Sequence, residues 1–149
     1  MSLYDHTDSL GFLTGLSSRL FNNQLAVRFQ QAQIDMTPEQ WGVLVVLIEH
    51  QSMTQAELGE KLYLEKSSVS RCVDGLEKKG WILRAKDPND SRKKRVSATQ
   101  KTAEIATRCA EIASQLLDEA QRGVSEQVLE NSQQMLGHVI KNLRQMNHN

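Results

Sequence analysis

The chain has 149 residues, of which 24% are charged and 39% hydrophobic, and its formal net charge is zero. This length and composition predict one helix-rich globular domain, and the most apolar run, residues 43–48, is too short to cross a membrane. The first residues lack the basic and apolar pattern of a secretory signal, so we expect a cytoplasmic protein.

The neutral total hides a segregated charge pattern. Residues 65–101 hold 11 Lys and Arg against 5 Asp and Glu, whereas residues 1–64 hold 3 against 7 and residues 102–149 hold 4 against 6. A local basic face is enough to displace phosphate counterions, so zero net charge does not exclude nucleic acid. A charge run is more often only a solvated face, and the surrounding motifs must decide between the two.

Apolar residues at spacings of three and four predict a helix over residues 7–33. Thr37, Pro38 and Gln40 then predict a second helix start, because Thr can cap, Pro suits the first helical position and Gln completes a capping box. The helix that follows is apolar on nearly every side and should therefore lie at the centre of the fold.

Thr54 and Glu57 form a second capping-box pattern and predict a short helix, in which Gly59 indicates a close approach by a neighbour. After a turn at residues 63–65, another helix is predicted up to Gly80, which suits the position that ends a helix. Its inward face is Val69, Cys72, Val73 and Leu76, and its outward face includes Lys66, Ser67, Ser68, Ser70 and Arg71.

Residues 81–86 and 95–97 are predicted strands, separated by turn-forming residues 87–90 and a basic tip at residues 92–95. Thr99 is expected to cap a long helix that Gly123 interrupts, and a last apolar-striped helix follows.

This order of elements predicts a mainly α fold with a small antiparallel β-wing, that is, a winged helix-turn-helix plus a helical dimerisation region. The expected domains are residues 1–36 (N-terminal helix of the dimerisation region), 37–99 (winged helix-turn-helix) and 100–149 (C-terminal dimerisation helices). The wide apolar stripes at both ends predict pairing of two subunits. The alternative is a monomeric bundle that folds back on itself.

The run LEKSSVSRCVDGLEKKGWILRAKDPNDSRKKRVSAT resembles the recognition helix and wing of the MarR family of bacterial transcription regulators. The resemblance extends over nearly the whole chain, with a leading helix, the winged domain and two trailing helices. The matching features are Ser68-Val69-Ser70-Arg71, Val73-Asp74, Leu76-Glu77, Gly80, Asp87-Pro88, Asp90-Ser91-Arg92, Val96 and Thr99.

The resemblance implies a homodimer that binds a pseudo-palindromic operator, more often as a repressor than as an activator, and that a small ligand or an oxidant releases. Positions that enter the major groove or hold its phosphates match Ser67, Ser68, Ser70 and Arg71. Arg92 matches the wing-tip arginine of the minor groove, and Asp90 matches the acidic residue that orients it. With the neighbouring basic residues, the predicted DNA-binding set is Lys66, Ser67, Ser68, Ser70, Arg71, Asp90, Arg92, Lys93, Lys94 and Arg95.

Two alternatives to ligand-controlled DNA binding stay open. A winged fold can serve as a protein-interaction module, although such a module has no need of four consecutive basic residues beside an Asp-x-Arg. Thiol-sensing family members carry a cysteine near the N-terminus, whereas residues 1–71 hold none, so a redox-responsive regulator would have to act through Cys72. A small core hydrophobe is the more ordinary role for that residue, and Cys109 has no metal-ligand spacing.

Nothing in the sequence predicts an enzyme. The four histidines are scattered without metal-ligand spacing, and no glycine-rich loop could cradle a phosphate, so we expect neither a metal nor a cofactor. The effector ligand is not encoded in any motif.

Overall fold

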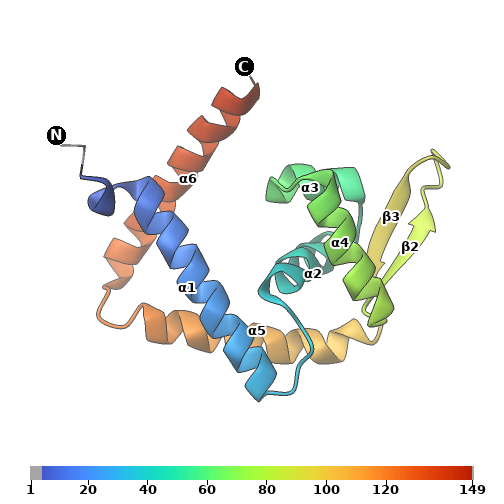
Figure 1. Cartoon of the computed structure of the whole chain (residues 1–149), viewed down its shortest axis with the longest axis horizontal. Coiled ribbons are helices and arrows are strands. Elements are labelled where there is room, and N and C mark those ends of the chain that lie inside the picture. The colour runs from blue at the N-terminus through green and yellow to red at the C-terminus, as the bar shows by residue number, and fades with distance from the viewer. Residues whose placement is uncertain (1–4, 149) are drawn as a thin grey trace. The chain divides into compact units, whose positions relative to one another are not determined.

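The computed structural model of the chain describes residues 5–148 (Figure 1). It divides into two compact units, Met1–Leu116 and Leu117–Asn149. The helices and strands are η1 (His6–Asp8), α1 (Leu10–Gln31), α2 (Pro38–His50), β1 (Ser52–Thr54), α3 (Gln55–Leu62), α4 (Lys66–Lys78), β2 (Ile82–Lys86), β3 (Lys94–Ala98), α5 (Thr102–Ala120) and α6 (Glu126–His148).

Both predicted capping boxes are present and begin α2 and α3. The Gln40 amide donates to Thr37 Oγ1 over 3.1 Å, and the Thr37 amide donates to Gln40 Oε1 over 3.2 Å. Thr54 and Glu57 repeat this exchange over 3.1 and 3.0 Å. Each box satisfies amides that a helix start otherwise leaves without partners, which explains why both helices begin where the sequence predicts.

The small sheet has three antiparallel strands in the order β1-β3-β2. The predicted hairpin is confirmed as β2 and β3, while β1 was not predicted, because three residues between two helices carry no readable alternation. Gln51, with a φ of 64°, turns the chain from α2 into β1. Met53 then lies opposite Val96, and both side chains are buried against the helices.

Helix α2 lies at the centre of the core, as its composition predicts. Trp41, Val43, Leu44, Val46 and Leu47 are buried along it. Val45 and Ile48 on the same helix are exposed, so α2 is less completely buried than its nearly all-apolar sequence predicts. The core also takes in residues from every other described element of the first unit apart from η1.

The chain leaves α4 through Gly80, whose φ of 78° is the left-handed conformation that favours glycine at a helix end. Helix α5 begins at Thr102, so the prediction that Thr99 caps it was wrong. The Thr99 hydroxyl instead donates to the Gly80 carbonyl over 2.8 Å, and the buried Thr102 hydroxyl donates to the Trp81 carbonyl. The two threonine hydroxyls therefore connect residues 99–102, where α5 begins, to residues 80–81, which precede β2.

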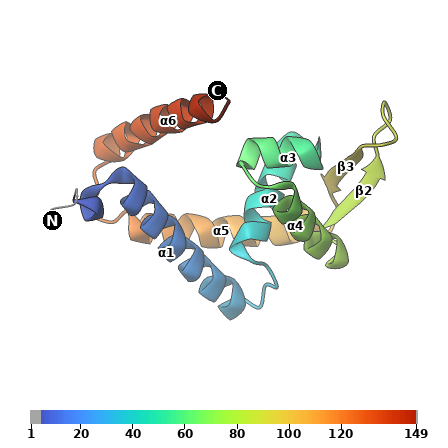
Figure 2. The same ribbon diagram turned by 45° about the horizontal axis from the view of Figure 1, so that its top comes forward.

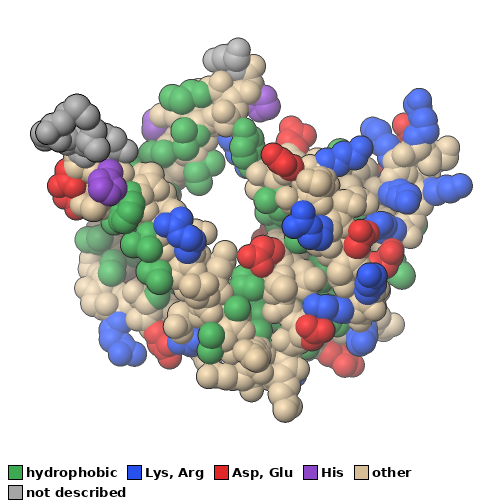
Figure 3. Space-filling view, in the orientation of Figure 1, with side chains coloured by type: hydrophobic (Ala, Val, Ile, Leu, Met, Phe, Trp, Pro, Cys, Tyr) green, Lys and Arg blue, Asp and Glu red, His purple; other side chains and the backbone are tan. Residues whose placement is uncertain are grey.

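The terminal helices carry apolar side chains that their own units do not cover. Along α1 only Phe29 is buried, and α6 has no buried residue among those the structure describes. Figure 3 shows hydrophobic side chains at the surface of both helices. The exposed large apolar residues are Leu10, Phe12, Leu13, Leu16, Leu20 and Val27 on α1, and Val128, Met135, Ile140, Leu143 and Met146 on α6.

Candidate nucleic-acid interface

Helix α4 presents an apolar face to the core and a polar face to solvent. Val69, Val73 and Leu76 are buried, as predicted. A Cβ at Gly59 would lie 3.0 Å from the Leu64 carbonyl and 3.5 Å from Val69, so the glycine lets α3 approach α4 closely. On the outward face, the described side chains of Lys66, Ser67 and Arg71 are exposed and those of Ser68 and Ser70 half-buried.

The first turn of α4 lacks a side-chain cap. Its N-cap, Glu65, makes no side-chain capping hydrogen bond, and Lys66 and Ser67 follow it directly at the surface. First-turn amides without intrahelical acceptors point along the axis and donate readily to a phosphate oxygen. Short serine hydroxyls and a forked arginine add donors that suit phosphates and base edges.

At the wing tip, Asp90 holds the exposed side chain of Arg92 in place. Asp90 Oδ1 accepts hydrogen bonds from the Arg92 amide over 3.1 Å and from Arg92 Nε over 3.2 Å, while the Arg92 side chain keeps 90% of its surface exposed. The Arg92 side chain and amide both hold the pKa of Asp90 below its usual range. The carboxylate therefore stays charged at neutral pH and aims the guanidinium, whose outer face remains available.

The wing and the start of α4 lie on one side of the first unit. After Gly80 the hairpin packs against α4 through β2, and its tip points to the same side as the N-terminal end of that helix (Figure 1); Figure 2 shows the hairpin beside α4 from a second direction. Figure 3 shows Lys and Arg side chains gathered over the hairpin. Arg92, Lys93 and Lys94 are exposed there. Six of the ten predicted residues are thus exposed on α4 or the wing, and Ser68, Ser70 and Asp90 are half-buried there; the DNA contacts of these nine stay a prediction.

Arg95 is the exception. Its Nε donates to Ser52 Oγ over 2.9 Å, its Nη2 to the Ser52 carbonyl over 3.1 Å and its Nη1 to Asp87 Oδ2 over 3.1 Å. All three guanidinium nitrogens are thus engaged within the chain, and the side chain is only 32% exposed. The basic run 92–95 hid this difference, because the sequence alone does not show that Ser52 lies on a strand paired with β3.

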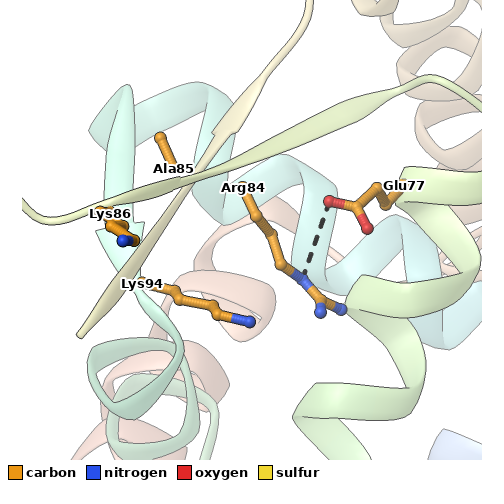
Figure 4. Close-up of a pocket in the computed structure, with 5 residues that line it drawn as sticks. All are labelled: Glu77, Arg84, Ala85, Lys86 and Lys94. Carbon is orange, nitrogen blue, oxygen red and sulfur yellow. Dashed lines mark ion pairs between the residues drawn. The ribbon is translucent and has the colours of Figure 1, made fainter. Parts of the chain in front are cut away.

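Arg84 ties the wing to α4 and was missed by the sequence prediction. Figure 4 shows it reaching from β2 toward Glu77, whose carboxylate lies 4.0 Å from Arg84 Nε. Its Nη2 also pairs with Asp74. The two acidic residues lie three apart on an otherwise basic outward face, and this spacing is the signal that could have pointed to a basic partner. A shallow hollow of about 230 Å³ beside the pair is rimmed by Ala85, Lys86 and Lys94.

The two cysteines lie in environments that suppress thiolate formation. Burial raises the pKa of Cys109 to about 11, and the side chain is fully buried in the core. Burial, with a smaller contribution from Glu39, raises the pKa of the half-buried Cys72, and Arg71 only partly opposes this. Because the thiolate is the reactive species, this geometry favours packing over redox sensing at Cys72.

Neither a metal cluster nor a membrane-spanning helix lies in the part of the chain that the structure describes. Across residues 5–148, no three His, Cys, Asp or Glu side chains are grouped so that they could hold a metal ion. Over the same range, no helix combines the length and the apolar composition needed to cross a membrane.

Comparison with known proteins finds a family match for the winged domain. Residues 36–94 match the family model described as "MarR family". The chain is 27% identical over 135 residues to the organic hydroperoxide resistance transcriptional regulator of Bacillus subtilis, covering 89% of this chain and 87% of the relative. It is also 27% identical over 107 residues to the homoprotocatechuate degradative operon repressor of Escherichia coli, covering 72% and 70%.

Solved structures agree with the fold. A cysteine-to-serine mutant of MarR from E. coli, in a crystal structure complexed with operator DNA, aligns with a TM-score of 0.77 and 26% identity over 93% of this chain and 99% of that one. The relatives are named as transcriptional regulators or repressors, in agreement with the prediction that the chain is not an enzyme. The family model covers the helix-turn-helix and most of the wing, and the curated and solved relatives extend the similarity over most of the chain. These similarities connect the winged domain with the MarR family, whose model matches residues 36–94, and the chain as a whole with transcriptional regulators of the same fold.

Proposed function

We propose that the chain is a homodimeric repressor that binds a pseudo-palindromic operator through α4 and the wing of each subunit. The observation that carries the proposal is Arg92, a surface guanidinium that Asp90 holds in place at the tip of the wing. A narrow minor groove concentrates negative potential and attracts such an arginine. The operator complex of the related E. coli protein supports the same use of this fold.

Within each major groove, Arg71 is the residue we expect to read bases. Its guanidinium is exposed on the outward face of α4 and can take guanine O6 and N7 together. Ser67, Ser68 and Ser70 are short enough to approach bases or phosphates without steric cost, while Lys66 and Lys93 are placed to neutralise phosphates. Two α4 helices in successive grooves would set the half-sites about one helical turn apart.

The unburied apolar faces of α1 and α6 support the homodimer. Monomeric proteins rarely expose large contiguous apolar patches, and a two-fold interface would cover both helices with their own counterparts. A dimer also matches a pseudo-palindromic operator, since each subunit then reads one half-site. The division of labour expected from the sequence, with residues 37–99 reading DNA and the terminal segments pairing, rests on this proposal.

Control by a small ligand follows from the same geometry. A molecule that prefers one spacing of the two α4 helices shifts the population toward that spacing, and operator affinity falls when the spacing no longer fits. The relative named as an operon repressor supports repression over activation. The identity of the effector is to be found by screening for compounds that release bound DNA.

The decisive experiment selects duplex DNA bound by the full chain from a random pool and measures its affinity by fluorescence anisotropy at about 50 and 200 mM salt. Arg71→Ala should cost about 1–3 kcal/mol and relax base choice, while Lys93→Ala should weaken all sequences alike and lower the salt slope by about 1. Arg122→Ala, an exposed arginine in the turn before α6, is the matched control and should change neither quantity.

Two outcomes would contradict the proposal. If Arg71→Ala and Arg92→Ala both left affinity untouched at fixed salt, the assigned face would not be the DNA-binding face. If no duplex were enriched at all, the protein-interaction alternative would replace DNA reading.

A further inference from the structure

The wing loop is connected to the rest of the domain by a continuous chain of hydrogen bonds. Ser52 on β1 accepts from Arg95 on β3, at its hydroxyl over 2.9 Å and at its carbonyl over 3.1 Å. Arg95 also donates to Asp87 Oδ2 over 3.1 Å, at the point where the chain leaves β2 for the loop. The guanidinium thus joins an edge strand, the middle strand and the loop.

From Asp87 the chain of bonds continues to the wing tip. Asp87 Oδ1 accepts from the Asn89 amide over 2.8 Å and from the Asp90 amide over 3.2 Å. The Asp90 carboxylate in turn holds the amide and the Nε of Arg92. Both oxygens of Asp87 are therefore engaged, one by the loop amides and one by Arg95, and its side chain is only 10% exposed.

The sheet register explains why this connection is possible. Arg95 pairs with Thr54, so Ser52 is its diagonal neighbour on the same face of β1. Thr54 is also the N-cap of α3, which places the far end of the connection at the start of the helix-turn-helix. An arginine suits this position because its planar fork can bond in three directions at once, whereas a lysine has a single nitrogen.

We infer that Arg95 and Asp87 are positioning residues that hold the wing loop so that it presents Arg92, and that Arg95 is not itself a DNA contact. The inference rests on the proposed function for its DNA consequence and revises the sequence-based place of Arg95 among the DNA-binding residues. The negative charge of Asp87 makes the inference testable, because Asp87 belongs to the wing, which is expected to lie close to phosphates. By charge alone, its removal should strengthen DNA binding, whereas loss of the anchor should weaken it.

The first arm of the test uses operator affinity and a double-mutant cycle. Arg95→Ala and Asp87→Asn should each weaken binding by about 5- to 10-fold, and Arg95→Ala should cost almost nothing further in an Arg92→Ala background, because it acts through Arg92. Arg95→Lys keeps the positive charge but not the branched guanidinium, so its affinity should stay as low as that of Arg95→Ala. Lys94→Ala, which removes the adjacent exposed charge, is the matched control and should lower the salt slope.

The second arm needs no DNA. In the free full-length protein, Arg95→Ala and Asp87→Asn should speed amide hydrogen exchange at Asn89, Asp90 and Arg92, while amides in α2 keep their protection. Unchanged α2 protection also shows that each variant is folded. The hydrogen-exchange result tests the positioning role of Arg95 and Asp87 without DNA. If the proposed DNA-binding function were wrong, Arg71→Ala would have no effect on affinity, so the two failures can be told apart.

Three results would overturn the inference. The first is unchanged exchange at the wing amides in both variants. The second is full additivity of Arg95→Ala with Arg92→Ala together with a salt slope lower by about 1, which would make Arg95 a phosphate contact. The third is tighter operator binding by Asp87→Asn, which would mean that charge, not position, governs this residue.

Discussion

The winged domain and the terminal helices use similar apolar residues with different results. Helix α2 buries five side chains in 13 residues, whereas α1 buries one in 22 and α6 none of those described in 23. The difference does not come from leucine content, since α1 is rich in leucine. It comes from neighbours: α2 is surrounded by α1, β1, α3, α4 and β3, while the terminal faces meet too little of their own unit. The winged domain therefore has its own core, whereas the terminal helices leave apolar faces exposed that the proposed homodimer would cover.

The largest effect should come from emptying that core. Leu44→Ala removes a fully buried side chain of α2 and should lower the free energy of unfolding by about 2–5 kcal/mol. The matched control is Leu20→Ala on α1, whose side chain is 56% exposed. Urea unfolding at a protein concentration low enough to separate subunits should show a change within about 0.5 kcal/mol for the control. Equal losses of unfolding free energy in the two variants would contradict the difference between the buried α2 and the exposed face of α1.

A partner surface at the terminal helices can be tested directly. Leu143→Ser on α6 places a polar group where the side chain is 51% exposed in the single chain. If that position is covered in a dimer, the free energy of association should fall by about 1.5–3 kcal/mol, with little change in the unfolding of the winged domain. Sedimentation equilibrium over a range of concentrations measures the association. Gln133→Ser, an exposed polar position on the same helix, should leave it unchanged.

The helix caps offer a smaller version of the same comparison. Thr54→Ala breaks a reciprocal, part-buried capping box and should cost about 1 kcal/mol of domain stability. Ser9→Ala removes a single exposed cap at the start of α1, where Ser9 Oγ accepts from the Phe12 amide over 3.2 Å. Its cost should be a few tenths of a kcal/mol, seen only as fraying of α1 in hydrogen exchange. A global destabilisation by Ser9→Ala as large as that of Thr54→Ala would contradict this account.

The sequence predicts the winged domain well because its signals are local. Capping boxes, the glycine after α4 and the turn residues of the wing each act within a few positions, and they placed the starts of α2 and α3, the end of α4 and the β2-β3 hairpin. The features that it missed all depend on distant partners. Strand β1 exists because Met53 and its neighbours pair with β3, and Arg84 matters because Asp74 and Glu77 lie across from it.

The candidate interface shows the same limit in a single stretch of sequence. Arg92 and Arg95 are two arginines in one basic run, and the Asp-x-Arg pattern singled out Arg92 without showing that Arg95 bonds within the chain. In the structure, the first projects from the tip and the second bonds to Ser52, which lies 43 positions earlier. Local charge therefore identifies the basic wing, while the division between residues facing outward and residues anchoring the wing requires the fold.

Cys109 marks where the winged core ends and should give the smallest effect, a difference in labelling rate. Although it lies on α5, beyond the predicted boundary at residue 99, it is fully buried in the core, and the partly buried Ile105 and Ile112 pack against the same core. Because its pKa is raised to about 11, the folded state holds the thiol proton more tightly than the unfolded chain does. The resulting contribution to stability is therefore full below the ordinary thiol pKa and is lost as the pH rises toward 11.

At pH 8 a thiol reagent should consequently label Cys109 only at the rate of global unfolding, and Leu44→Ala should speed that labelling in proportion to its loss of stability. Cys72 should react sooner, though more slowly than an exposed thiol, since it is half-buried on α4. Mass spectrometry of the peptides after timed labelling, with Cys72→Ser as the control, separates the two. Labelling of Cys109 ahead of Cys72 would place the first half of α5 with the loosely covered terminal helices instead of the winged core.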